Sequence, residues 1–292
     1  MNKQQINDFD KIVLTGFMVS LARQFTDIVY AQELAQLIEK EGLVKLSQPQ
    51  NQDKSVLLTA RVEARYKAIN QVIAQYQITQ VLELASGLLP RGLLMSKNPN
   101  ITFIESDLPE MIRYKQQLIQ QLVGERSNLH FIEIDATSRP SEFIKSTPLL
   151  KAGQPVMILC EGLLTHLTLV EKELVCTNIR EMLHRYSGVW ITSDFIDTGS
   201  LMRSQQDDSG LKKLLQAGTN LTGRSLVNNN FGTLEQARQF VYEQGFRATE
   251  YNMLKVIDEL SCLEILGIDP EVVRRMLTTQ SVFALTLDSH PS

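Results

Sequence analysis

Residues 81–92 read VLELASGLLPRG, and this stretch decides the fold. Its first part, 81–85, is an apolar run that predicts a buried strand. Gly87 follows in the turn, where a residue without a side chain lets the backbone approach a ligand closely. Glu83 interrupts the apolar run, and a carboxylate in a buried strand is costly unless it is paired. Glu83 is therefore either a ligand-binding residue or a structural one, bonded to neighbouring amides or to an arginine.

Six more short apolar runs follow this strand, and longer amphipathic segments separate most of them. The predicted strands are 101–105, 129–134, 155–161, 189–195, 246–254 and 280–287. The predicted helices between them are 109–123, 168–186 and 232–245. Strands that alternate with helices form parallel sheets through right-handed crossovers. The sequence thus predicts an α/β fold with a doubly wound, mostly parallel sheet of seven strands.

The chain before residue 80 has a helical pattern. Apolar residues recur every three or four positions over 14–29, as they do on one face of a helix. Further helices are predicted over 31–41 and 57–76. We therefore expect a helical cap over 1–78 that precedes the main domain.

The main domain is expected over 79–292 and contains two segments with a weaker pattern. Residues from about 197 to 230 are polar and contain glycines, which favours a lid insertion. The segment 255–276 is predicted to be irregular, with one short helix.

Composition narrows the class of protein. The formal net charge is −4, and no basic tract occurs, so nucleic acid is not an expected partner. The apolar stretch 12–22 is too short to span a bilayer and lacks the layout of a secretory signal. Three separated cysteines, Cys160, Cys176 and Cys262, have neither a disulfide pattern nor zinc-site spacing. We expect a cytoplasmic protein with no membrane partner and no metal.

Acidic residues follow the strands at the edge where open α/β sheets bind ligands. Asp107 lies 20 positions after Gly87, the spacing at which a carboxylate binds a ribose diol, although it could instead cap the helix that begins near Pro109. Asp135 follows the third strand. Its carboxylate and the adjacent backbone N–H can form hydrogen bonds with the amino edge of an adenine. A turn or cap residue is the alternative for Asp135.

Glu161 ends the very apolar fourth strand, so a cationic ligand or an arginine partner is expected there. His166 follows five residues later and is either a base or a packing residue. No G-x-G-x-x-G fingerprint and no P-loop accompany these groups, which indicates a nucleoside ligand without phosphates. S-adenosylmethionine, with its ribose, adenine and sulfonium cation, fits this pattern.

At these residues the chain resembles the leucine carboxyl methyltransferase-like family of class I methyltransferases, which includes bacterial polyketide-associated O-methyltransferases. The resemblance covers roughly residues 12–200. Its motifs are a T-x7-R pattern from Thr15 to Arg23, the segment 65–70, ELASG, ESDLPEMIRYK, EIDA and CEGLLTHL. It implies a Rossmann-like fold with an antiparallel seventh strand and S-adenosylmethionine as the methyl donor.

The resemblance also implies roles for single residues. Arg65 matches the arginine that pairs with the methionyl carboxylate of the donor, with Arg23 a basic position near it. Glu161 matches the acidic residue near the methionine moiety, and Gly87 matches the glycine under the donor. The remaining cofactor positions are the ribose acid Asp107 and the adenine contacts Asp135 and Ala136.

Two positions depart from the family pattern. The usual turn G-x-G-x-D-x-x-x-x-R is replaced by residues 86–91, SGLLPR, without the first glycine and the aspartate. His166 stands where the phosphatase methyltransferases usually have tyrosine, and it is the candidate catalytic residue.

The expected activity is O-methyl transfer to a carboxylate or hydroxyl of a small molecule or peptide. A non-catalytic module that binds S-adenosylmethionine or a protein partner is the main alternative, because of the altered turn. A short-chain dehydrogenase is disfavoured, since the Y-x-x-x-K formed by Tyr251 and Lys255 lies in a predicted strand without the glycine fingerprint. A nucleic-acid methyltransferase is disfavoured because the [DN]-P-P-[YF] motif is missing.

Overall fold

Seven strands form one sheet in the computed structural model, which describes residues 8–40, 56–145, 147, 149–196, 198–199 and 229–288. The strands are β1 (Gln80–Leu84), β2 (Thr102–Asp107), β3 (Leu129–Glu133), β4 (Val156–Cys160), β5 (Gly188–Thr192), β6 (Phe246–Asn252) and β7 (Ser281–Leu287). All seven predicted strands are present, with ends that differ by a few residues from the apolar runs.

The strand order is β3-β2-β1-β4-β5-β7-β6. Strands β1 to β5 are mutually parallel, whereas β7 runs antiparallel to both β5 and β6. This arrangement confirms the doubly wound, mostly parallel sheet and its antiparallel seventh strand. Because β1 pairs with both β2 and β4, the chain reverses its direction of winding at β1, and a crevice opens beyond the carboxyl ends there.

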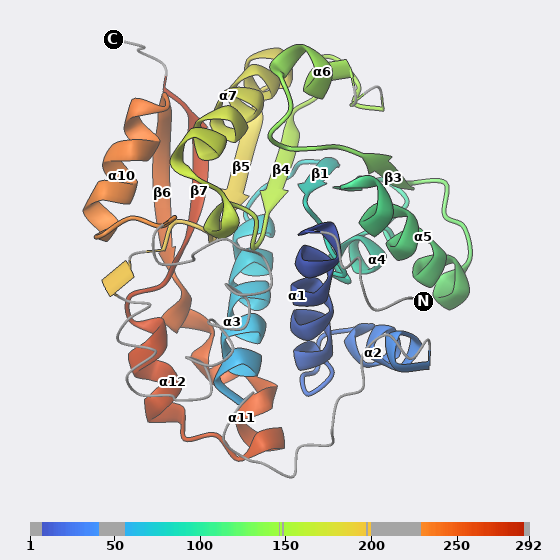
Figure 1. Ribbon diagram of the computed structural model, residues 1–292, viewed down its shortest axis with the longest axis vertical. Helices are drawn as coiled ribbons and strands as arrows, with labels where there is room; N and C mark the ends of the chain where they lie inside the picture. Colours follow the sequence, from blue (N-terminus) through green and yellow to red (C-terminus); the bar gives the residue numbers. More distant parts are fainter. Residues whose placement is uncertain are drawn as a thin grey trace.

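Helices cover both faces of the sheet, as Figure 1 shows. One face packs on α3 (Val56–Ile73), α4 (Arg91–Met95), α5 (Pro109–Val123), α11 (Ser261–Leu266) and α12 (Pro270–Leu277). The other face packs on α6 (Pro140–Lys145), α7 (Leu169–Tyr186) and α10 (Leu234–Glu243). Successive strand residues alternate between these layers: Val81 belongs to the first core and Leu82 to the second. Burial on both faces explains why the strands are continuous apolar runs.

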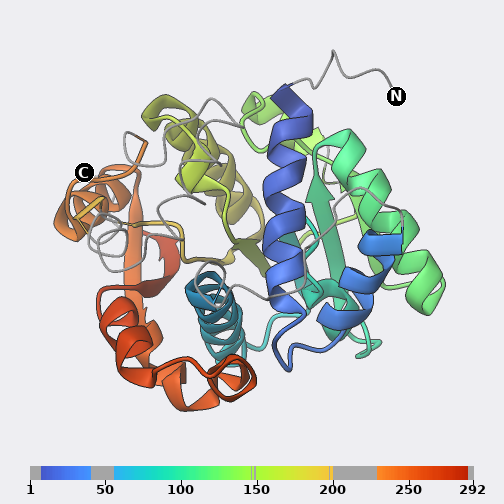
Figure 2. The ribbon, with the colours of Figure 1, turned by 60° about the horizontal axis from the view of Figure 1, so that its bottom comes forward.

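The first two helices, α1 (Asp8–Arg23) and α2 (Ala31–Lys40), precede α3. Figures 1 and 2 show α1 running beside α3, close to the carboxyl ends of the central strands. Leu21 of α1 shares one hydrophobic core with Val81 and Leu93. These helices are therefore packed onto the sheet rather than held apart from it.

The helix predicted over 14–29 ends earlier, at Arg23. The Thr26 hydroxyl donates to the Arg23 carbonyl at 2.7 Å and accepts from the Ile28 N–H at 3.2 Å. Tyr30 then adopts a left-handed φ of 70°. Local side-chain hydrogen bonds thus turn the chain where the apolar spacing alone favoured a longer helix.

The segment 255–276 is more regular than expected. It contains the 3₁₀-helix η2 (Met253–Glu259) and the helices α11 and α12. Gly267, with a left-handed backbone, ends α11, and the Asp269 carboxylate caps α12 by accepting from the Glu271 N–H at 2.9 Å. The lid predicted at about 197–230 lies almost entirely outside the described residues. Among the helices described, none is long and apolar enough to cross a membrane.

Glu63 of α3 fastens the C-terminal helices to the N-terminal ones. Its buried carboxylate accepts from the Ser261 N–H at 2.9 Å, the Ser261 hydroxyl at 2.7 Å and the Cys262 N–H at 3.0 Å. Lys67 lies 2.7 Å from the same carboxylate and 2.6 Å from Asp27 in the loop after α1. One buried acid therefore caps α11 and joins three segments that are distant in sequence.

Replacing Glu63 with alanine should lower the free energy of unfolding by about 3 kcal/mol, because two amides and an ammonium lose their buried partner. Urea denaturation followed by circular dichroism measures the change. The exposed Glu181→Ala variant on α7 is the matched control and should change stability by less than about 0.5 kcal/mol. Equal stability of the two variants would contradict a structural role for Glu63.

Candidate active site

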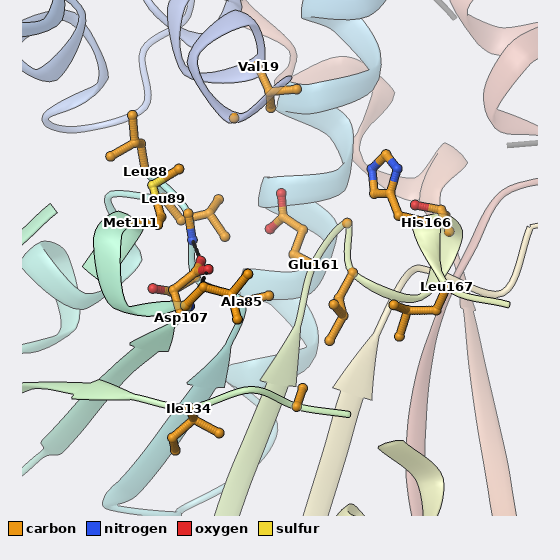
Figure 3. Close-up of a pocket in the computed structure, with 18 of the residues that line it drawn as sticks. Val19, Ala85, Leu88, Leu89, Asp107, Met111, Ile134, Glu161, His166 and Leu167 are labelled. Carbon is orange, nitrogen blue, oxygen red and sulfur yellow. Dashed lines mark hydrogen bonds between the residues drawn. The ribbon is translucent and has the colours of Figure 1, made fainter. Parts of the chain in front are cut away.

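A cavity of about 350 Å³ opens beyond the carboxyl ends of β1, β2 and β4 (Figure 3). Its walls come from α1, α3 and α5 and from the segments that follow β1, β2, β3 and β4. The lining includes Val19, Arg23, Arg65, Gly87, Leu88, Met111, Asp107, Ile134, Asp135, Ala136, Glu161, His166 and Leu167. Eight of the nine predicted site residues, all except Glu83, are therefore brought to one crevice.

Asp107 and Gly87 meet across two strands of the sheet. The Gly87 N–H donates to Asp107 Oδ2 at 2.7 Å, and the Leu108 N–H donates to Oδ1 at 2.8 Å. Burial raises the pKa of Asp107, although these two amides oppose the rise. The α5 N-cap is Leu108, so Asp107 does not serve as the cap that the sequence left open.

Gly87 itself has a left-handed φ of 45°, and a Cβ built on it would meet nothing within 4 Å. The backbone is thus exposed to the open cavity at this point, where only glycine adopts the conformation without strain.

Asp135 and Ala136 form the wall after β3. Asp135 Oδ1 accepts from the Thr137 N–H at 2.8 Å and from the Thr137 hydroxyl at 2.7 Å. The predicted turn role is therefore real, and it fixes a carboxylate at the cavity wall. Ala136 is buried beside it, so its backbone N–H belongs to the same rigid turn.

Glu161 is the electrostatic centre of the site. Its buried carboxylate accepts from three guanidinium groups: Arg23 Nη2 at 3.3 Å, Arg65 Nε at 3.0 Å and Arg91 Nη2 at 2.7 Å. Burial alone would raise the pKa of Glu161, but attraction to the arginines outweighs it and lowers the pKa to about 2. The sequence predicted an arginine partner or a cationic ligand for Glu161, and the structure shows three arginine partners.

Glu83 lies behind this cluster and does not line the cavity. Its carboxylate pairs with Arg91, whose Nε also donates to Asn70 Oδ1 at 3.0 Å. The Arg91 guanidinium stacks over the Tyr66 ring at 4.6 Å. Of the two roles that the sequence left open for Glu83, the contacts match the structural one, because Glu83 pairs with Arg91 and neither residue lines the cavity.

Two groups of the site were missed by the sequence analysis. Arg91 stood in the turn LLPRG without an assigned partner, because the partners Glu83 and Glu161 lie 8 and 70 residues away. Asp194 follows β5 and accepts from the N–H groups of Gly162, Leu163 and Leu164 at 2.7, 2.7 and 2.9 Å. An aspartate near the end of the apolar strand predicted over 189–195 was the available signal for Asp194.

His166 ends the 3₁₀-helix η1 (Leu164–His166) at the opposite side of the cavity from Asp107 (Figure 3). The Asp194 carboxylate accepts hydrogen bonds from the N–H groups of Leu163 and Leu164, at the start of this helix. These bonds fix the backbone segment to which the His166 side chain is attached. The His166 carbonyl accepts from Asn229 Nδ2 at 3.3 Å. The histidine is therefore half-buried at the cavity wall, on the β4 side.

The groups around the cavity are complementary to a nucleoside joined to a zwitterionic amino acid. Arg65 and Glu161 offer opposite charges at one end, and the carboxylates of Asp107 and Asp135 lie at the other. Apolar side chains such as Leu88 and Met111 also line the cavity, next to Asp107 (Figure 3). Among the described residues, no group of acidic, histidine or cysteine side chains is arranged to hold a metal ion. The residues present fit S-adenosylmethionine.

Replacing Glu161 with glutamine should make stability less dependent on pH in acid. A carboxyl whose pKa is lowered on folding stabilises the fold above its unfolded pKa of about 4.5, and the contribution of about 3 kcal/mol is lost as pH falls toward 2. The difference in unfolding free energy between wild type and variant should therefore shrink between pH 4.5 and pH 2. Urea titrations at pH 7, 4.5 and 3 measure it, with the exposed Glu39→Gln as control. If the difference in unfolding free energy between wild type and variant stayed constant with pH, the arginines would not be lowering the pKa of Glu161.

Known proteins resemble the chain in sequence and in fold. The family model of leucine carboxyl methyltransferases matches residues 12–180, more than half of the chain. A candidate methyltransferase from Thermobifida fusca has a similar fold, with 17% identity, a TM-score of 0.57 and coverage of 93% of this chain and 94% of that one. A DUF574 family protein from Streptomyces avermitilis has 13% identity, a TM-score of 0.57 and coverage of 92% and 96%.

No curated protein matches the sequence. The two structural likenesses show a shared fold, and the family match supplies the activity. The chain belongs to the leucine carboxyl methyltransferase family and is an S-adenosylmethionine-dependent methyltransferase.

Proposed function

We propose that the enzyme transfers a methyl group to an oxygen, the carboxylate or hydroxyl of a small molecule or peptide. The supporting observation is the charge of the groups around the β4 end of the cavity. Arg65 lines the cavity there, and three arginines surround the single carboxylate of Glu161, so positive charge is in excess at this end. A cationic surrounding favours an oxyanion over an amine as the attacking group.

The amino-acid end of the donor is held by Arg65 and Glu161 in this proposal. Arg65 keeps 16% of its side chain exposed and donates through Nε to Glu161, so its other N–H groups remain for a carboxylate. Glu161 offers its negative charge to an ammonium group. Arg23 of α1 completes the pair from the other side of the crevice.

The nucleoside end is held by the segments after β1, β2 and β3. The Asp107 carboxylate accepts hydrogen bonds from the ribose hydroxyls. Because Gly87 has no side chain, the donor can lie directly against the backbone at that residue. Asp135 and the Ala136 N–H bind the adenine edge. The hydrogen bonds that Asp107 and Asp135 make to backbone amides fix both carboxylates before the donor arrives.

S-adenosylmethionine supplies a methyl group already activated by its sulfonium. The protein is left to align the acceptor and to exclude water, and orientation of this kind contributes roughly 7–11 kcal/mol. A carboxylate acceptor is ionised at neutral pH and needs no base, whereas a hydroxyl needs one. In this proposal His166, which lines the cavity, accepts that proton.

The helical segments before the sheet form a cover over the donor in this proposal. Gly16, Val19 and Arg23 of α1 line the cavity, and α3 contributes Arg65. In this proposal the region over 1–78 acts as a cap on the domain over 79–292.

Replacing Arg65 with alanine should weaken binding of S-adenosylmethionine by roughly 30-fold or more, because the loss of a charge pair at a buried site costs about 2–5 kcal/mol. Calorimetric titration with S-adenosylmethionine and S-adenosylhomocysteine measures it. The variant should fold, since Glu161 retains Arg23 and Arg91. The control Arg113→Ala removes an exposed pair with Glu133 and should leave the affinity unchanged. Unaltered donor affinity in the Arg65 variant would contradict the assignment.

Replacing His166 with alanine should lower kcat on a hydroxyl acceptor by about 10²–10⁴-fold, with little change in donor affinity. A panel of phenols, alcohols and carboxylic acids, assayed with a labelled methyl donor, measures the effect. On carboxylic acids kcat should change little, because no proton has to be removed. Full turnover of the variant on a hydroxyl acceptor would dismiss the base role. Donor binding without turnover on any acceptor would favour a non-catalytic module instead.

A further inference from the structure

A buried ion pair beside the turn after β1 takes no part in the proposed chemistry. Glu105 of β2 and Lys115 of α5 are the first and last residues of the motif ESDLPEMIRYK. Both side chains are fully buried, and the Lys115 ammonium donates a hydrogen bond to the Glu105 carboxylate. Neither residue lines the cavity. Because a buried ion pair is often no more stabilising than apolar residues of the same size, stability alone does not explain this one.

Lys115 makes a second hydrogen bond, to the backbone of the turn itself. Its Nζ donates to the Ser86 carbonyl at 3.3 Å. The same carbonyl accepts from the Leu89 N–H at 3.0 Å, and the Ser86 N–H donates to the Ser106 carbonyl of β2 at 2.9 Å. The turn is therefore fastened to α5 through Lys115 and to β2 through its own backbone.

The backbone conformation of this turn is one that needs support. Ala85 has a φ of 49° and Gly87 a φ of 45°, so two of its positions are left-handed. Ala85 carries a Cβ, and a left-handed backbone is unfavourable for such a residue. Conformations of this kind persist where the surrounding structure holds them. The turn also lacks the first glycine and the aspartate of the family pattern, so contacts from outside it, such as that of Lys115, carry more of the support.

Gly92 of α4 keeps the ion pair in place from the other side. A Cβ built on Gly92 would overlap the Glu105 carboxylate, lying 2.9 Å from its Cδ and 3.0 Å from Cδ1 of Phe103. Only a residue without a side chain lets α4 pack this closely on the carboxylate. Glu105 is thus enclosed between β2 and α4, and the Lys115 ammonium bonded to it is held at a fixed place beside Ser86.

The position of the turn decides where groups of the donor site lie. Ala85, Ser86 and Gly87 all line the cavity. The Gly87 N–H donates to Asp107 Oδ2 at 2.7 Å, so a shift of Ser86 would move Gly87 and disturb the Asp107 carboxylate with it. Burial raises the pKa of Asp107, and the ammonium of Lys115 is one of the groups that oppose the rise. Lys115 therefore acts on the donor site both through the backbone and through its charge.

We propose that Lys115 is a positioning residue of the donor site, which holds residues 85–87 through the Ser86 carbonyl in the conformation that receives S-adenosylmethionine. Glu105 keeps the ammonium in place for this bond. The inference rests on the proposed function, because it takes Gly87 and Asp107 as the groups that hold the nucleoside end. Lys115 touches no atom of the donor and acts only through the turn.

Paired variants separate positioning from stability. Lys115→Met removes the bond to Ser86 but leaves the Glu105 carboxylate buried without its cation, whereas Glu105→Gln combined with Lys115→Met removes the bond and leaves no buried charge. Glu63→Ala is the matched control, because Glu63 is a buried acid that lies outside the cavity lining. Each protein is characterised by urea denaturation, by calorimetric titration with S-adenosylhomocysteine, and by hydrogen exchange of the peptide that covers 84–90.

We expect the double variant to unfold at a higher urea concentration than Lys115→Met, yet to bind S-adenosylhomocysteine about 10-fold or more weakly than wild type. Its amides in the peptide over 84–90 should exchange faster than those of wild type. Glu63→Ala should lose stability and keep its affinity for S-adenosylhomocysteine.

Two results would overturn the proposal. One is a double variant whose affinity for S-adenosylhomocysteine stays within threefold of wild type. The other is a Glu63→Ala variant that loses as much affinity as the double variant, because the loss would then follow stability rather than the position of the turn. Failure of wild type itself to bind S-adenosylhomocysteine would instead reject the proposed function, so the two failures are distinguishable.

Discussion

A single carboxylate, that of Glu161, is removed from water and held by three guanidinium groups. Arg23 comes from α1, Arg65 from α3 and Arg91 from the start of α4, so one buried acid joins the N-terminal helices to the centre of the sheet. Removing a partner from such a cluster leaves buried charge uncompensated, which costs about 3–5 kcal/mol. This cluster of Glu161 and the three arginines therefore connects the helices to the sheet and also sets the charge at one end of the cavity.

The topology of the sheet explains why the cluster coincides with the ligand crevice. The chain winds outward from β1 to β3, then returns to place β4 on the other side of β1. Segments that leave β1, β2 and β4 must diverge there, and the gap between them receives side chains from α1 and α3. Acidic groups at neighbouring strand ends thus lie at fixed separations. Asp107 and Asp135 lie on one side of β1, and Glu161 with its arginines lies on the other.

Patterns local in sequence were sufficient for most of the fold. Continuous apolar runs identified all seven strands, and Pro109 marked the first residue of α5. The pattern failed where a few polar atoms decide the backbone, as at Thr26, which ends α1 early, and at Asp269, which begins α12. At the site, Gly87 and Asp107, which are 20 residues apart, form a direct hydrogen bond. The partners of Arg91 could not be predicted from spacing in this way, because the pairing of β1 with β4 brings Glu161 to Arg91 from a distant part of the sequence.

The most direct test of the proposed donor site is a crystal structure with S-adenosylhomocysteine bound. We predict that the carboxylate of its amino-acid end contacts the Arg65 guanidinium, that its ammonium faces Glu161, and that its ribose hydroxyls contact Asp107. A ligand found outside the crevice, or bound with its amino-acid end turned away from the arginine cluster, would contradict this assignment.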